Sequence, residues 1–259
     1  MERNALLARF YSLLDDLERQ VGGKQRLDDC DGYMDWPDRG VYFFFASDEH
    51  RGDGDQLRLT RVGTHAVSTG AGTTLWNRLR THRGALRGTY EDGGNHRGSV
   101  FRERVGEALV ERHDLHDEYP EWGEGSSAGR DRRLAELDLE RRVSDYIRDL
   151  PFLWVAVDDE PGPESDRAYL ERNAIALASN YGEESIDPRA DGWLGTNSPS
   201  ETIRGSGLWN VDHVEESYDP AFLDRLAGAI EEPAPRSSPG ADRHRTRCVG
   251  DAPPYRRSG

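Results

Sequence analysis

Apolar residues follow two patterns along the chain, one with helical spacing and one of short continuous runs. Leucines and a phenylalanine recur at helical spacing between positions 6 and 17, with charged residues between them, which predicts an amphipathic opening helix. The runs GVYFFFA (40–46) and LRLTRVGTH (57–65) are rich in aromatic and branched residues, as is typical of buried strands. Gly52 and Gly54 lie in the polar segment between them, so we expect an antiparallel hairpin.

The remaining periodic segments predict further helices and one more strand. Thr73 or Thr74 is expected to cap a helix that ends at Gly84, and Ser165 or Asp166 a later one. The run PFLWVAVD (151–158) predicts the third strand. Other helices are expected from 100 to 110, from about 130 to 150, around YLERNAIALASN (169–180) and from 220 to 230. Three strands among helices predict an α/β domain.

The length of 259 residues fits one elaborated domain better than two full ones. We expect a helical, turn-rich lead-in at 1–37, a central domain at 38–182, a packed extension at 183–231 and a tail at 232–259. The tail consists mostly of Pro, Arg, Ser and Gly and carries six arginines against three acidic residues. Such a composition favours disorder.

The charge balance is strongly acidic, with 49 Asp and Glu against 34 Lys and Arg and a net charge of −15. Lys24 is the single lysine. This composition is typical of cells with a very salty interior, where salt screens the repulsion between like charges; a GC-rich genome is the alternative explanation for arginine in place of lysine. An acidic chain is a poor electrostatic match for nucleic acid, so binding to it requires a locally basic surface.

Cysteine usage and hydropathy exclude several protein classes. Cys30 and Cys248 are the two cysteines, too few for a disulfide framework and without zinc-finger spacing. The first twenty residues lack a signal peptide's apolar core, and no segment reaches membrane-spanning length. We therefore expect a soluble cytoplasmic protein with no membrane partner. His113 and His116 have no third ligand nearby and are expected to be solvated rather than metal-bound.

Several short motifs follow one another in a characteristic order. They are GVY (40–42), RVG (61–63), Arg78 and His82 on one predicted helix, Glu171 on a later helix, and Asn180 beyond it. Each is weak alone, but their succession resembles the GIY-YIG nuclease family over roughly residues 38–182. The resemblance implies a small three-stranded antiparallel sheet flanked by helices, here with helical extensions at both ends. It also implies a metal-dependent DNA endonuclease.

The resemblance assigns chemistry to three of these side chains. Tyr42 would take the proton from the attacking water, although a free phenol, with a pKa of about 10, needs nearby positive charge to act as a base. Arg78 would grip the scissile phosphate. His82 lies four residues on and shares the helix face, a spacing that resembles the restriction-endonuclease branch. The structural alternatives are a core tyrosine and a solvated helix face.

Two further residues match the family pattern after the third strand. Glu171 would bind a single divalent cation, Mg²⁺ or Mn²⁺, together with water and substrate phosphate; alternatively it only favours the N-terminal part of its helix. Asn180 would orient a phosphate or a motif tyrosine, or else cap the end of the helix.

Contacts to the DNA backbone are expected from basic and amide groups near these motifs. Arg80 and Arg83 lie on the same predicted helix as Arg78. The loop GGNHRG (93–98) combines exposed amides with a cation beside a helix start, which suits phosphate, although it can equally be a simple turn. The expected DNA-binding residues are Arg61, Arg80, Arg83, Asn95, His96 and Arg97.

Arg61 is the clear departure from the family pattern, because it stands where the second motif begins with tyrosine. Arginine cannot act as a base, but it can bind phosphate or favour the phenolate of Tyr42. Two alternatives therefore stay open: a catalytically weakened nucleic-acid-binding protein of the same fold, and a protein-interaction module. Cleavage of both strands of a duplex would favour a homodimer.

Overall fold

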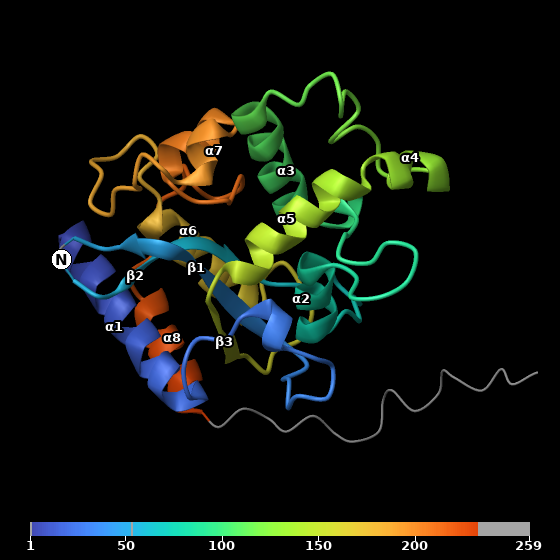
Figure 1. Cartoon of the computed structure of the whole chain (residues 1–259). Helices are drawn as coiled ribbons and strands as arrows, with labels where there is room; N and C mark the ends of the chain where they lie inside the picture. The colour runs from blue at the N-terminus through green and yellow to red at the C-terminus, as the bar shows by residue number, and fades with distance from the viewer. Residues whose placement is uncertain (1, 53, 233–259) are drawn as a thin grey trace, which may run out of the picture.

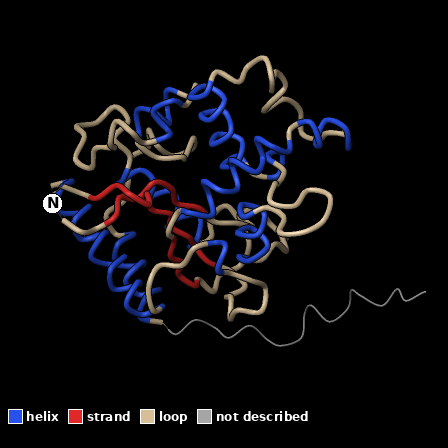
Figure 2. Tube along the Cα trace, viewed as in Figure 1, coloured by secondary structure: helices blue, strands red, loops and turns tan. Residues whose placement is uncertain are grey.

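The computed structural model describes residues 2–52 and 54–232, shown in Figure 1. Apart from Glu232, the predicted tail at 232–259 lies outside the described residues. At the centre is a three-stranded antiparallel sheet in the order β2-β1-β3, formed by β1 (Gly40–His50), β2 (Leu57–Gly63) and β3 (Phe152–Ala156). Figure 2 shows these strands surrounded by helices. The predicted three-stranded antiparallel sheet flanked by helices is confirmed.

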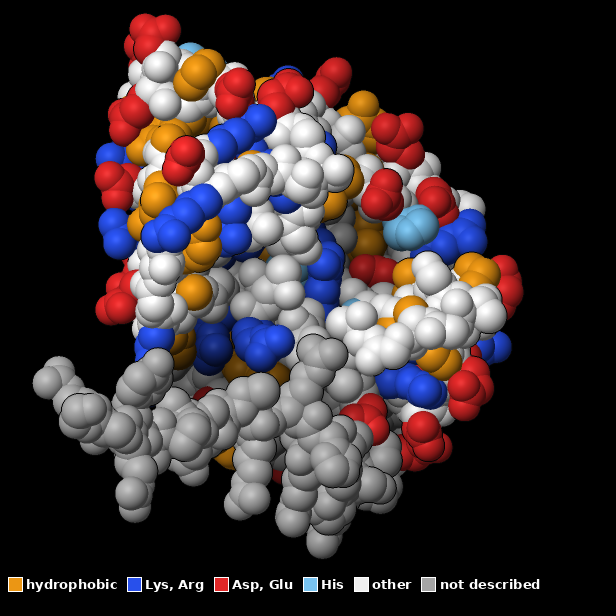
Figure 3. All heavy atoms as spheres, turned by 90° about the vertical axis from the view of Figure 1, so that its right-hand side faces the viewer, with side chains coloured by type: hydrophobic (Ala, Val, Ile, Leu, Met, Phe, Trp, Pro, Cys, Tyr) orange, Lys and Arg blue, Asp and Glu red, His pale blue; other side chains and the backbone are white. Residues whose placement is uncertain are grey.

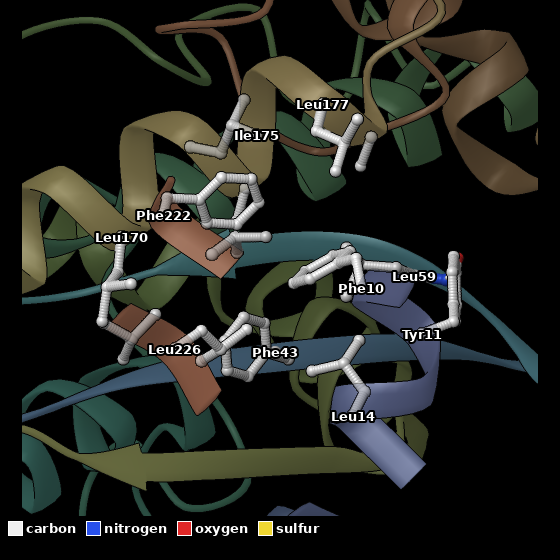
Figure 4. Packing of buried hydrophobic residues seen from close by; sticks show 14 of the residues in the cluster. Phe10, Tyr11, Leu14, Phe43, Leu59, Leu170, Ile175, Leu177, Phe222 and Leu226 are labelled. Atoms are coloured by element: carbon white, nitrogen blue, oxygen red, sulfur yellow. The ribbon is translucent and has the colours of Figure 1, made fainter. Parts of the chain in front are cut away.

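Alternation along β1 divides the interior into two cores, because successive strand residues point to opposite faces. Val41, Phe43 and Phe45 enter one core and Tyr42 and Phe44 the other. The first core is covered by α1 (Arg3–Val21), α6 (Asp166–Ala178) and α8 (Phe222–Glu231). Figure 4 shows Phe10, Phe43 and Phe222 meeting there. The second is covered by α2 (Leu75–Arg83), α3 (Val100–His113) and α5 (Leu137–Asp149).

Local capping explains where the site helices begin. The Thr74 hydroxyl accepts a hydrogen bond from Asn77 N at 3.2 Å, and α2 ends at Gly84, as predicted. Ser165 caps α6 in the same manner. Ser99 caps α3 and accepts from Arg102 N. These caps stabilise the first turns of the helices whose side chains build the site.

Some elements differ from the sequence-based prediction. The single charged helix expected from 130 to 150 is two helices, α4 (Arg130–Ala135) and α5, which meet at Glu136. Glu136 is buried there and bonded to both Arg97 and Arg132, which holds the junction. A helix in the extension and three short 3₁₀ turns were not predicted: α7 (Glu201–Ser206), η1 (Leu27–Asp29), η2 (His96–Gly98) and η3 (Leu194–Asn197).

A change of register interrupts the pairing of β1 with β2. Phe44 lies opposite Arg61, whereas the next residue, Phe45, lies opposite Leu59. Thr60 is therefore an extra residue, and such a bulge reverses the face to which the following side chains point. Leu59 enters the first core, and Arg61 and Gly63 instead face the side of Tyr42.

The C-terminal extension lies along the edge of β2 that β1 does not occupy. Trp209 N donates to Thr60 O at 2.7 Å, and the Asn210 side chain bonds both Val62 N (3.1 Å) and Val62 O (2.8 Å). Helices α1 and α8, from the lead-in and the extension, lie side by side against the sheet (Figure 1). Both terminal segments thus pack into the same cores as the central domain. No helix among residues 2–52 and 54–232 is long and apolar enough to cross a membrane.

Candidate active site

A hydrogen-bonded chain of three buried side chains joins β1, α2 and the start of α3. The Tyr42 hydroxyl lies 2.8 Å from His82 Nε2, and His82 Nδ1 lies 2.8 Å from Ser99 Oγ. Tyr42 and His82 are both fully buried. Burial first, and then the nearby Arg78, Arg61 and Arg102, lower the pKa of His82 well below its usual value. The imidazole is therefore neutral, and it fixes the orientation of the phenol.

Gly63 lies directly beneath this phenol. It pairs with Tyr42 across the β1–β2 ladder, and a Cβ at position 63 would lie 2.3 Å from both Cζ and Oη of Tyr42. Any residue larger than glycine at position 63 would therefore displace the phenol of Tyr42. The glycine of the second motif is thus explained by close packing rather than by its backbone angles.

Gly63→Ala is expected to displace the phenol and break its bond to His82. Because buried overpacking is destabilising, the free energy of unfolding should fall by about 1–3 kcal/mol, as measured by chemical denaturation. Gly228→Ala is the matched control, because a Cβ at this exposed position of α8 meets no atom within 4 Å. Replacing a glycine inside a helix by alanine stabilises the helix, so this variant should not lose stability. Equal stability of Gly63→Ala and the wild-type protein would contradict the observed packing.

Arg78 and Arg61 lie beside the Tyr42–His82 pair, on α2 and β2. Arg78 Nη1 donates weakly to Gly98 O at 3.4 Å, and its Nε is buried without a hydrogen-bond partner in the described part of the chain. Burial lowers the pKa of the Arg61 guanidinium; nearby Tyr42 and Glu171 raise it, and Arg78 lowers it further. The structure therefore gathers residues from four separate elements: Tyr42 of β1, Arg61 of β2, Arg78 and His82 of α2, and Glu171 of α6.

Glu171 enters this cluster from α6 at the end of β2. Its Oε1 accepts a hydrogen bond from Thr64 N at 3.0 Å, while Oε2 takes part in no hydrogen bond or ion pair within the described residues. Burial raises the pKa of the carboxyl, and Arg61 and the Thr64 amide oppose that effect. The free oxygen suits a hard cation such as Mg²⁺. The described residues hold no group of three or more His, Cys, Asp or Glu that could bind a metal, so water and substrate would complete the coordination.

Two histidines near this cluster were not identified from the sequence. His65 follows the RVG motif, and Nδ1 lies 2.8 Å from Thr73 O while Nε2 is buried without a partner in the described chain. Burial and Arg167 lower the pKa of His65 to about 4, so it is neutral at pH 7. His213, from the extension, influences Glu171 and has a left-handed backbone (φ 64°). The position of His65 directly after the motif was the available signal; His213 had none.

Asn180 has a structural arrangement outside the hydrogen bonds of this cluster. Its Nδ2 donates to Asp187 O at 2.9 Å, and its Oδ1 accepts from Ile186 N at 3.3 Å. The side chain thus closes the loop that follows α6. This arrangement is closer to the expected helix-end role than to a contact with phosphate.

The residues expected to bind DNA from the loop at 93–98 are mostly engaged inside the protein. His96 is fully buried, bonded to Glu140 and stacked on Trp122. Arg97 forms two hydrogen bonds to the Glu136 carboxylate, at 2.6 and 2.7 Å. Asn95 has a buried side-chain oxygen without a partner in the described chain. We therefore revise the expectation for His96 and Arg97, whose partners leave no exposed cationic surface.

The two other helical arginines differ from each other. Arg83 is buried, donates to Cys30 O at 2.5 Å and lies over the Trp76 ring, so it holds η1 against α2 and does not face solvent. Arg80 is exposed and stays a candidate for a contact with the DNA backbone.

His116, just beyond the end of α3, pairs with Glu111 at 3.4 Å, in keeping with the expected solvated histidine.

The surface on the side of α2 offers a place for an anionic ligand despite the acidic net charge. Figure 3 shows this side with basic side chains gathered around a hollow in the middle of the face. Acidic side chains lie mostly along its margins. Binding to a polyanion requires a locally basic surface of this kind.

Comparison with known proteins identifies the family. The model of a family described as GIY-YIG domain matches residues 1–236 of the chain. The match includes the lead-in and the extension as well as the central segment. No curated protein matches the chain, and no solved structure does.

Proposed function

Because the chain belongs to the GIY-YIG domain family, we propose that it is an endonuclease that hydrolyses DNA phosphodiester bonds with one Mg²⁺ or Mn²⁺. Domains of this family are usually nucleases, and GIY-YIG nucleases act on DNA. The observation that carries the proposal is the buried Tyr42–His82 hydrogen bond beside Arg78 and Glu171. The affiliation with the restriction-endonuclease branch, the homodimer and the cytoplasmic location stay predictions.

Tyr42 is the proposed base for the attacking water. In the reactive form the phenol has lost its proton, and neutral His82 donates Nε2–H to the phenolate while Nδ1 accepts from the Ser99 hydroxyl. A hydroxyl can both donate and accept, so Ser99 serves this tautomer while also capping α3. The phenolate then takes a proton from the attacking water.

Arg78 and Glu171 act on the other reacting groups. The Arg78 guanidinium binds a non-bridging phosphate oxygen, on which negative charge increases as water attacks. Glu171 would hold the divalent cation through its free oxygen. When bound, the cation would supply Lewis-acid stabilisation of the charge that develops in the reaction.

Removal of divalent cations is expected to abolish cleavage. Supercoiled plasmid incubated with the protein in molar KCl should be nicked or linearised in the presence of Mg²⁺ or Mn²⁺. The plasmid should stay intact with EDTA, because the chelator removes a cation that the protein holds through the proposed single carboxylate of Glu171. Gel electrophoresis of the plasmid measures both outcomes. Intact plasmid under every metal and salt condition would contradict the proposal.

The alternative is a DNA-binding protein that has lost cleavage, and Arg61 in place of the second-motif tyrosine is the observation that favours it. Binding of a DNA duplex without cleavage under all metals would support this alternative. Absence of both binding and cleavage would favour a protein-interaction module.

A further inference from the structure

We propose that Arg61 is a second substrate-contacting residue, which binds the scissile phosphate jointly with Arg78 where the family has a tyrosine. This inference rests on the proposed nuclease function and deepens it. The site would then hold its phosphate between two guanidinium groups, one from β2 and one from α2, beside the Tyr42 phenol.

The bulge at Thr60 directs Arg61 into the site. With regular alternation, Arg61 would share the face of Leu59 and enter the apolar core under α1 and α6. The extra residue instead places Arg61 opposite Phe44, on the face that carries Tyr42. Bulges of this kind re-aim side chains next to active sites, and here the re-aimed side chain is a cation.

Arg61 is buried without a counter-charge, as is Arg83, whereas Arg58, Arg102 and Arg167 each have a carboxylate partner. Arg58, three positions before Arg61 on β2, has Glu49 at 2.7 Å. Arg102 and Arg167 have Glu140 and Asp159, each at 2.5 Å. Arg61 is only 7% exposed, yet no carboxylate of the described residues lies within 4.0 Å of its guanidinium. A buried cation without an anion is costly, so the arrangement is stabilised when an anion binds.

The contacts of Arg61 fix its position while leaving donors free. Nη1 donates to Trp209 O at 2.9 Å, and the guanidinium carbon lies 4.7 Å from the centre of the Phe101 ring. Nε is buried without a partner in the described chain, as is Nε of Arg78. The Tyr42 hydroxyl also shares a side-chain hydrogen bond with Arg61. The carbonyl, the ring and the phenol are uncharged, so they orient the guanidinium without neutralising it. The C-terminal extension thereby becomes part of the site, because it supplies the carbonyl of Trp209.

The chemistry of the free groups favours a phosphate diester. Guanidinium nitrogens donate in a planar fork that matches two oxygens of one phosphate. Glu171 lies close enough to raise the pKa of Arg61 but forms no ion pair with it. The carboxylate therefore leaves the guanidinium nitrogens available to a phosphate. Its free oxygen can then hold the cation while the two arginines hold the phosphate.

Binding of inorganic phosphate to the full chain, measured by calorimetry in KCl, tests the anion site without cleavage. Arg61→Gln should weaken phosphate binding about tenfold or more, as expected for loss of a charge-assisted bond. Arg61→Lys should retain part of it. Arg19→Gln on the exposed face of α1 removes the same charge and should leave binding unchanged. Equal phosphate affinity of Arg61→Gln and the wild-type protein would overturn the proposal.

Plasmid cleavage then separates a contact in the reaction from a purely structural role. Arg61→Gln and Arg61→Tyr should each reduce kcat by about 100- to 1000-fold, the usual effect of losing one preorganised donor, with Arg61→Lys intermediate. If Arg61→Lys is as inactive as Arg61→Gln although both unfold at the wild-type temperature, or if Arg61→Tyr equals the wild-type rate, the inference fails. Failure of the wild-type protein to cleave, with Arg61-dependent phosphate binding intact, would overturn the proposed function alone.

Discussion

Glu171→Gln is expected to reduce plasmid cleavage by about 1000-fold or more, because the cation contributes several kcal/mol to the transition state and each 1.36 kcal/mol is tenfold in rate. The amide oxygen of glutamine can still accept from Thr64 N, so the end of β2 should keep its geometry. The substitution removes the charge of the proposed metal ligand and little else. The rate of nicking at saturating Mg²⁺ measures the loss.

Binding measurements make this prediction specific. Mn²⁺ binding, followed by electron paramagnetic resonance, should weaken in Glu171→Gln together with cleavage. Glu164→Gln, at an exposed position before α6, removes the same charge and should change neither. Duplex binding in the absence of metal should survive in Glu171→Gln. A nicking rate within threefold of wild type would rule out Glu171 as the ligand.

Tyr42→Phe removes a single oxygen and should reduce the cleavage rate by about 100- to 10,000-fold, the range typical of a general base. The ring can still pack edge-on against Phe44, whose centroid lies 5.7 Å away. The Nε2 atom of His82 loses its partner, which should lower the free energy of unfolding by about 1–3 kcal/mol. Denaturation curves measured beside the cleavage rates separate these effects.

Tyr11→Phe is the matched control for Tyr42→Phe. The Tyr11 hydroxyl is also buried and hydrogen-bonded, to Asp187 at 2.6 Å, but it lies in the core under α1. This variant should lose stability and keep its cleavage rate per folded molecule. Isolation of a covalent adduct between Tyr42 and DNA would show a nucleophile instead of a base and would contradict the proposed role.

The sequence predicted the fold well where a local pattern determines it. The aromatic and branched residues of GVYFFFA predicted β1, and Thr73 or Thr74 together with Gly84 predicted the two ends of α2. The spacing of Arg78 and His82 predicted that they share a helix face, and the motif order predicted the family. The strand, the helix ends and the shared helix face depend on neighbours within a few residues, which a sequence displays directly.

Features that depend on long-range pairing were not predictable. The bulge at Thr60, and with it the direction of Arg61, is defined only when β2 pairs with β1. The loop at 93–98 looked basic and exposed in the sequence. In the structure, Glu136 at the junction of α4 and α5 pairs with Arg97, and Glu140 on α5 pairs with His96. The contact between Trp209 and Arg61 joins residues 148 positions apart. The very salty interior inferred from composition stays a prediction.

The central claim is that one site built from Tyr42 and Glu171 cuts DNA with a divalent cation. Its most direct test compares nicking of supercoiled plasmid by the wild-type protein, Tyr42→Phe and Glu171→Gln, in molar KCl with Mg²⁺. We predict that the wild-type protein nicks or linearises the plasmid while both folded variants leave it essentially intact. Cleavage by both variants at the wild-type rate would contradict the site, and an intact plasmid with all three proteins would contradict the nuclease itself.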